Sequence, residues 1–206
     1  MPLVKAPVRN AIAAPPAPPP LSFDDAVAQL DSAIGSERRA AVHVLETRPA
    51  GIAALCTRFP VENAPSVREA ILAALIRLRS PEVVAAMLPL LRSEQPLLRN
   101  SALEVLAAMP DDVAPHVDAL LHDANSDVRI FTANLLSVLP HPRACEWLLV
   151  ALADAHQNVA AAAIDGLAEI GDPSAVQPLH DLCARFPDNE FIAFAARIAL
   201  DRIGGC

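Results

Sequence analysis

Residues 126–136 read SDVRIFTANLL, and similar stretches occur elsewhere in the chain. Residues 66–75 read SVREAILAAL, and residues 97–106 read LLRNSALEVL. Each stretch contains an apolar residue followed by arginine near its start, and each closes on a leucine eight residues after that apolar residue. The apolar residues in between recur at the spacing of one helix face. The stretch therefore predicts an α-helix that is repeated along the chain.

The residue directly before the arginine position of each copy, which we call its anchor, recurs at a nearly constant interval. The anchors lie 30, 31, 30, 31 and 33 residues apart and are Glu37, Val67, Leu98, Val128, Val159 and Ile192. A second apolar run with helical periodicity precedes most anchors, as in residues 81–91, 111–121 and 173–183. A fixed period of this length is typical of a solenoid of stacked helix pairs. The predicted pairs cover residues 22–48, 49–79, 81–109, 111–139, 141–170 and 172–203.

Helix start signals support these pairs. Ser80 and Asp172 each precede a proline, so a capping oxygen stands before a proline at the first helical position. Ser66 and Glu69 have the spacing of a capping box. The prediction is an all-α fold, a right-handed α-solenoid of about six helical-hairpin repeats.

Composition divides the chain into two parts. Residues 1–20 contain seven prolines, which predicts a disordered or polyproline II tail, and residues 21–206 form the solenoid. Aromatic residues make up only 3% of the chain. The core must therefore be built from Ala, Leu, Val and Ile, which suit close packing of helices.

The charge is unevenly distributed and excludes some partners. Residues 1–60 carry a net charge of +1, and residues 61–206 carry −9. An acidic body disfavours nucleic acid and anionic membrane surfaces. No apolar run is long enough to span a bilayer, and the prolines after Arg9 interrupt any signal peptide. We therefore expect a cytoplasmic protein.

The repeated phrases resemble the HEAT repeat. The clearest matches are residues 125–129, NSDVR, and residues 171–179, GDPSAVQPL. The short period resembles the subtype named for phycobilisome lyase subunits, and the resemblance covers about residues 21–203. The last two copies depart from the pattern, with Ala160 and Ala193 where arginine is typical. The resemblance implies a curved solenoid whose second helices line a concave face that binds partners.

The positions two and six after each anchor are expected to point away from the core along that concave face. The row begins basic, becomes acidic and rich in amides, and ends apolar, which suits a protein segment of mixed chemistry. An ordinary solvated helix face is the alternative, and for Phe194 and Ile198 so is a capping core or a dimer contact. The predicted partner-binding residues are Arg39, His43, Glu69, Asn100, Glu104, Ile130, Asn134, Asp165 and Phe194.

The arginines that follow three of the anchors are predicted to be structural. Arg68, Arg99 and Arg129 are too long for core positions, so we expect each to lie across the junction to the next repeat. There they would pair with acids or with free carbonyl groups near a turn. Asp127 suits such a partner for Arg129.

Enzymatic alternatives find little support in the residues. A di-iron hydroxylase of the HEAT-like type needs His-Glu pairs, and none of the six histidines is followed by glutamate. Two His-Asp pairs, at residues 122–123 and 180–181, are expected on solvated surface and far apart. A HEAT-like DNA glycosylase needs a basic groove with aromatics, whereas the single tryptophan, Trp147, is expected to pack half-buried. The lyase-type resemblance also allows a bilin lyase-like or chromophore-handling subunit.

The sequence thus favours a non-enzymatic adaptor that binds another protein on its concave face. It predicts no catalytic residue, metal or cofactor, and it does not indicate an oligomeric state. Cys56, Cys145 and Cys183 are expected in the core, and Cys206 ends the chain after two glycines.

Overall fold

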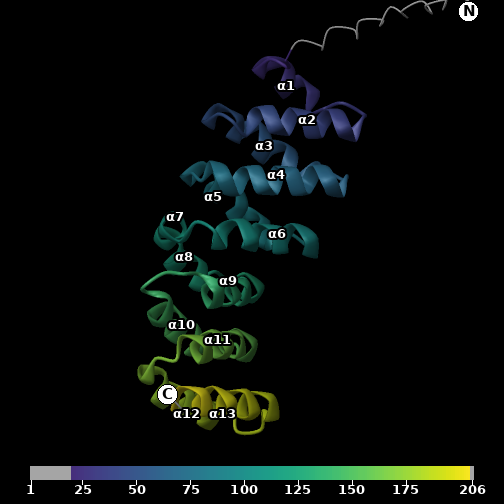
Figure 1. The fold of residues 1–206 in the computed structure, drawn as a ribbon. Coiled ribbons are helices and arrows are strands. Elements are labelled where there is room, and N and C mark those ends of the chain that lie inside the picture. Colours follow the sequence, from purple (N-terminus) through teal and green to yellow (C-terminus); the bar gives the residue numbers. More distant parts are fainter. Residues whose placement is uncertain (1–19, 205–206) are drawn as a thin grey trace, which may run out of the picture.

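The computed structural model describes residues 20–204, in which the chain forms α-helices and short 3-10 helices and no strand (Figure 1). The predicted all-α solenoid is therefore confirmed. Of the predicted tail, residues 1–19 lie outside the described residues, as does Cys206. The α-helices are α1 (Phe23–Gln29), α2 (Gly35–Leu45), α3 (Ile52–Arg58), α4 (Pro65–Leu78), α5 (Pro81–Met87), α6 (Pro96–Ala107), α7 (Pro110–Val113), α8 (Val117–Leu121), α9 (Ser126–Val138), α10 (Ala144–Leu152), α11 (Gln157–Ile170), α12 (Val176–Arg185) and α13 (Glu190–Gly204).

The helices stack in two layers. Helices α2, α4, α6, α9, α11 and α13 follow one another as a series of neighbours, and we call them the second-helix layer (Figure 1). Helices α1, α3, α5, α7 with α8, α10 and α12 form the first-helix layer behind it. Each pair therefore contacts mainly the pair before it and the pair after it, as expected of a solenoid.

The anchors and closing leucines hold the layers together. Val67, Val128, Val159 and Ile192 are all fully buried, and Leu98 is nearly so. Glu37, the anchor of the first copy, is exposed. The core that they form is one continuous cluster from Ala26 to Ile203, so no repeat has a separate core.

Prolines shorten the helices of the first layer. We expected one continuous helix at residues 81–91 and another at residues 111–121. Instead, α5 passes into a 3-10 helix at Leu88–Arg92, and the 3-10 helix Ala114–His116 separates α7 from α8. Pro89 and Pro115 lie at these breaks. Proline has no N–H to donate to the preceding turn, and its ring clashes with that turn.

Two of the three predicted helix starts are confirmed. The Ser80 hydroxyl accepts the Val83 amide at 3.3 Å, and the Asp172 carboxylate accepts the Ser174 amide at 2.8 Å. The predicted capping box of Ser66 is wrong. Pro65 occupies the first helical position and Ala64 the N-cap, so α4 begins two residues earlier than the capping box implies, and its N-cap residue has no side-chain cap.

One close approach requires glycine. A Cβ at Gly166 of α11 would lie 2.8 Å from Leu148 Cδ1 of α10 and 2.9 Å from Ser137 Cα of α9. Three helices therefore meet at a distance that only glycine permits. Within residues 20–204, no helix has the length and apolar character needed to cross a bilayer.

Candidate partner-binding face

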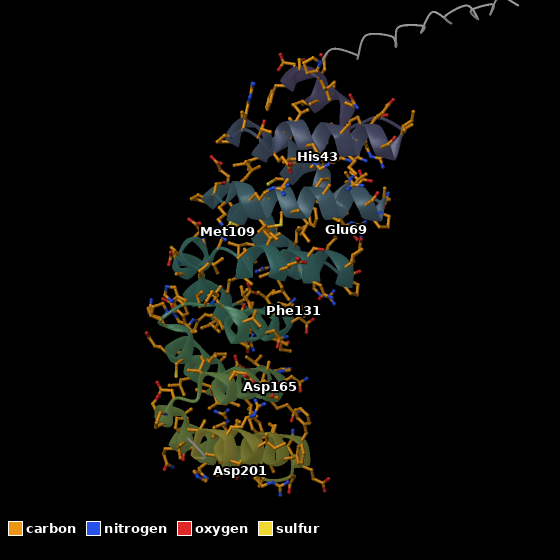
Figure 2. The ribbon with its side chains drawn as sticks, viewed as in Figure 1. His43, Glu69, Met109, Phe131, Asp165 and Asp201 are labelled. Carbon is orange, nitrogen blue, oxygen red and sulfur yellow. The ribbon has the colours of Figure 1, made fainter. Side chains whose placement is uncertain are left out.

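Positions two and six after each anchor share one side of the second-helix layer, which we call the open face. Its members are Arg39, His43, Glu69, Ala73, Asn100, Glu104, Ile130, Asn134, Ala161, Asp165, Phe194 and Ile198. All are exposed except Ile130 and Ala161, which are half-buried. Figure 2 shows His43, Glu69 and Asp165 following one another along this layer. The structure therefore brings the predicted partner-binding residues to one surface.

The middle of the open face is acidic. Among residues 20–204, Glu69, Glu104 and Asp165 form no hydrogen bond or ion pair through their side chains. Their charges are therefore neutralised only by solvent ions. The flanking acids differ in this respect, because Glu46 pairs with Arg77 and Glu169 pairs with Arg202. Three unpaired carboxylates on helices α4, α6 and α11 leave this part of the surface negative.

The end of the open face on α13 is apolar. Phe191, Phe194 and Ile198 are 66%, 54% and 42% exposed. They lie at helical spacing on α13, and the opposite side of that helix buries Ile192 and Ala196. The guanidinium of Arg197 lies 5.4 Å from the centre of the Phe194 ring. The result is an exposed apolar stripe that the fold itself does not use.

This stripe is distinct from the terminal surface of the solenoid. On α11, the positions one, five and nine after the anchor are buried, namely Ala160, Ile164 and Ala168. On α13, the equivalent residues Ala193, Arg197 and Asp201 are exposed, because no repeat follows within the described residues. The terminal surface is therefore largely polar, and Phe194 and Ile198 are not part of a capping core.

The repeat arginines are fixed by backbone contacts. Arg38, Arg99 and Arg129 each donate through Nη1 to the carbonyl group six residues earlier, at 2.7–2.8 Å. Arg68 donates to the carbonyl of Glu62 in the same way. The same type of contact therefore occurs in four successive repeats. Arg38 makes this contact too, although we did not predict a structural role for it from the sequence. Its position directly after the degenerate anchor Glu37 was the available signal.

Two of these arginines also reach the next repeat. Arg38 binds the Glu62 carboxylate through Nε and Nη2 at 2.8 and 2.7 Å. Arg129 binds Asp154 through Nε at 2.7 Å and Nη2 at 3.3 Å. The predicted partner of Arg129, Asp127, is therefore wrong. Asp127 precedes Arg129 on the same helix, whereas Asp154 lies in the turn of the following pair.

These contacts lower the pKa of both acids. The side chain of Glu62 is fully buried, and the hydrogen bond from Arg38 lowers its pKa to about 2. Burial by itself raises the pKa of Asp154. The hydrogen bonds from Arg129 and the His156 amide outweigh burial and hold that pKa below its ordinary value. Both acids are therefore charged at neutral pH and stabilise the junctions that they join.

In the part of the chain that the structure describes, the other two arginines form no ion pair with the residue at this place. Ser93 stands there for Arg68, and Asp123 stands there for Arg99 but pairs with Arg92. Within the described residues, the buried Nε atoms of Arg68 and Arg99 have no hydrogen-bond partner. The Arg99 guanidinium lies 4.8 Å from the centre of the Phe131 ring. Ser93 follows Arg68 by 25 residues, as Asp154 follows Arg129, so the two residues hold equivalent places in their turns. The Ser93 hydroxyl accepts the backbone amide of Gln95 at 3.2 Å.

The residues considered for catalysis do not come together. No group of three or more His, Cys, Asp or Glu side chains that could hold a metal ion occurs within residues 20–204. Asp123 pairs with Arg92, and Asp181 accepts the Gln177 amide at 2.8 Å. Trp147 is only 1% exposed rather than half-buried, and His141 stacks on its ring at 4.6 Å.

Two of the cysteines, Cys56 and Cys145, offer little reactive thiolate. Cys56, Cys145 and Cys183 are half-buried against the core, so they contribute to it from its edge. Burial, with the nearby Glu82 carboxylate, raises the pKa of Cys56 to about 11. Burial also raises the pKa of Cys145. Both thiols therefore remain protonated at neutral pH.

Among solved structures, the chain is similar to an engineered protein, with 19% identity, coverage of 89% of this chain and 96% of that one, and a TM-score of 0.41. A designed armadillo repeat protein is 17% identical, with coverage of 88% of this chain and 100% of that one and a TM-score of 0.40. The CpcE–CpcF complex of phycocyanin lyase from Nostoc sp. is 17% identical, with coverage of 98% of this chain and 100% of that one and a TM-score of 0.35.

No curated protein matches the chain. The family model described as HEAT repeats matches residues 113–201, which run from α7 to α13. This range contains the anchors Val128, Val159 and Ile192. The chain therefore resembles HEAT-repeat proteins over residues 113–201.

Proposed function

We propose that this chain is a non-enzymatic adaptor that holds a segment of another protein along its open face. The observation that carries the proposal is the row of exposed side chains on successive second helices. The row has three unpaired acids in its middle and an apolar stripe at its α13 end. Neither feature contributes to the core, so both are free to bind.

The exposed stripe on α13 favours a partner energetically. Complete burial of one large apolar side chain is worth about 1.5–3 kcal/mol. Phe191, Phe194 and Ile198 are each more than two-fifths exposed, so most of this stabilisation is unused in the chain alone. A partner that covers the stripe would gain part of it.

The proposal is non-enzymatic because the residues suited to catalysis have other partners. Asp123 and Asp181 already bind Arg92 and Gln177. His122 Nδ1 lies 2.8 Å from the Asp118 carbonyl oxygen. In this proposal residues 1–20 serve as a proline-rich tether beside the solenoid of residues 21–206.

Affinity capture from the native cell extract, read out by mass spectrometry, tests the proposal. The bait is the full chain, compared with a Glu104→Arg, Asp165→Arg variant. A second pair of reversals, Asp111→Arg with Asp181→Arg, lies on the first-helix layer and matches the change in charge.

We expect one protein to be retained by the wild type and by the first-layer variant, and lost by the open-face variant. Substitution of His122 or His180 should leave capture unchanged. Equal retention by both double variants would place the binding surface elsewhere and overturn the assignment of the open face.

A further inference from the structure

We propose that the segment held on the open face is extended, and that it carries two basic residues about six positions apart and a large apolar residue about three positions beyond the second. This inference rests on the proposed function and specifies the chemistry of the partner. It follows from the order of side chains along one straight row of the open face.

The row consists of the residues six positions after each anchor. On α6, α9, α11 and α13 these residues are Glu104, Asn134, Asp165 and Ile198. Because each occupies the same place in its helix and the helices are successive neighbours, they form a line across the layer. The line reads acid, amide, acid, apolar.

The spacing of the row matches an extended chain. Packed helices lie about 8–10 Å apart, so the two acids, two helices apart, are separated by roughly 16–20 Å. An extended segment advances about 3.1–3.4 Å per residue, or about three residues per helix. A segment in the polyproline II conformation, which has three residues per turn, thus presents one side chain to each helix at about every third residue. A helical segment advances only about 1.5 Å per residue and would need its basic residues about twelve apart.

Charge favours basic side chains of the bound segment opposite Glu104 and Asp165. Glu104 and Asp165 are exposed and unpaired within residues 20–204. Residues 61–206 carry a net charge of −9, so the surrounding field also favours cations. Arginine suits these positions because its guanidinium donates two parallel bonds to a carboxylate.

The apolar stripe fixes the end of the segment. Ile198 continues the row after Asp165, and Phe194 lies on the same side of α13 one helical turn earlier. Phe191, 66% exposed, extends this surface. A leucine or a larger apolar residue one step beyond the second basic residue would cover all three.

A synthetic peptide tests the inference directly. The probe is a fluorescein-labelled peptide with two arginines and one leucine at these separations in a Gly-Ser-Gln background, and binding is measured by fluorescence anisotropy with the full chain. A control peptide has the same composition with its arginines adjacent. The protein variants are Glu104→Gln with Asp165→Asn, Phe194→Ser, and Asp111→Asn with Asp181→Asn as a charge-matched control on the first-helix layer.

We expect the spaced peptide to bind more tightly than the control peptide and to weaken about five- to tenfold with the open-face double variant, the size of two exposed charge pairs. Phe194→Ser should weaken it about threefold or more, and the first-layer control should leave it unchanged. Affinity should fall as salt is added, because exposed charges are screened.

The outcomes separate this inference from the proposed function. Equal binding of both peptides, or no loss with the open-face variant, would overturn the inference. If in that case a cellular partner were still captured through the open face, the adaptor function would stand with a partner of different chemistry. If α13 bound a second copy instead, Phe194→Ser would reduce the mass measured by light scattering, and the peptide inference would again be wrong.

Discussion

Arg129 and Asp154 join two successive repeats through two hydrogen bonds, from Nε to Oδ2 at 2.7 Å and from Nη2 to Oδ1 at 3.3 Å. The same guanidinium donates to the Asp123 carbonyl at 2.7 Å, and the same carboxylate accepts the His156 amide at 2.7 Å. One pair of side chains therefore fixes two turns and the helices between them. Removal of either partner leaves the other charge with little solvent.

We expect Asp154→Asn to lower the free energy of unfolding by about 1–3 kcal/mol, because it leaves the Arg129 charge uncompensated in a mostly buried site. The two side chains are only 17% and 14% exposed. Urea unfolding followed by circular dichroism measures the effect. Glu146→Gln is the matched control, because the Arg143–Glu146 pair has similar geometry but is 49% and 61% exposed. That control should change stability by less than about 0.5 kcal/mol.

Stability should fall in acid because of Glu62. Its folded-state pKa of about 2 lies below the ordinary value of 4.5. The contribution is therefore complete above the ordinary pKa and is lost as the pH falls towards the folded pKa. We expect a loss of about 2–3 kcal/mol across this window. Thermal melts recorded between about pH 6 and pH 3 measure it.

Glu62→Gln should reduce that pH dependence, and it should already be destabilised at neutral pH because Arg38 and Arg58 lose their carboxylate. Glu104→Gln, an exposed acid without a partner, should retain the wild-type pH profile. An unchanged profile in Glu62→Gln would show that other acids carry the effect.

A new carboxylate at Ser93 should stabilise the chain. Ser93 accepts the Gln95 amide as Asp154 accepts the His156 amide, and the buried Nε of Arg68 opposite it has no partner. We expect Ser93→Asp to raise the free energy of unfolding by about 0.5–2 kcal/mol, since it supplies a charge-assisted bond. In an Arg68→Met background the same substitution should bring no gain. A gain of equal size in both backgrounds would contradict the pairing.

Gly166→Ala should destabilise the chain by about 1–3 kcal/mol, because the added Cβ would overlap the backbone of α9 and Leu148 of α10. Alanine is the better helix former by about 1 kcal/mol, so the clash must exceed that gain. Gly204→Ala, in open space near the end of α13, is the control and should be neutral or slightly stabilising. Thermal denaturation of both variants measures the difference.

Periodicity predicted the helix pairs well because the anchors from Val67 to Ile192 and the closing leucines from Leu45 to Leu167 are buried by their own repeat and its neighbours. The start of α4 was predicted less well, because the signal of Pro65 competes with that of Ser66 and Glu69, and the proline decides the first turn. The breaks at Pro89 and Pro115 follow from the same property of proline and were predictable in principle.

Pairing across repeats was harder to predict. The sequence places Asp127 beside Arg129, but a helix directs residues two apart to different sides. The observed partner of Arg129, Asp154, can be recognised only when the turns of successive repeats are aligned with one another. Ser32, Glu62, Ser93, Asp123 and Asp154 recur at intervals of 30, 31, 30 and 31 residues, each in the same turn. The residue types on the open face were predictable, because exposure follows from position on the helix. Whether its acids are paired was not predictable, because that depends on which side chains of neighbouring helices meet.

The series of turn-binding arginines ends at Arg129, since alanines stand at the equivalent positions 160 and 193. Beyond that point Arg185 of α12 donates to the carbonyl groups of Leu152 and Ala153 instead. The arginine contact with a turn is therefore restricted to the first four units, and the last two are joined by Arg185 and by the packing of α11 against α9, α10 and α13. A segment bound across Phe191, Phe194 and Ile198 would act as a splint that slows the opening of the final helix pair.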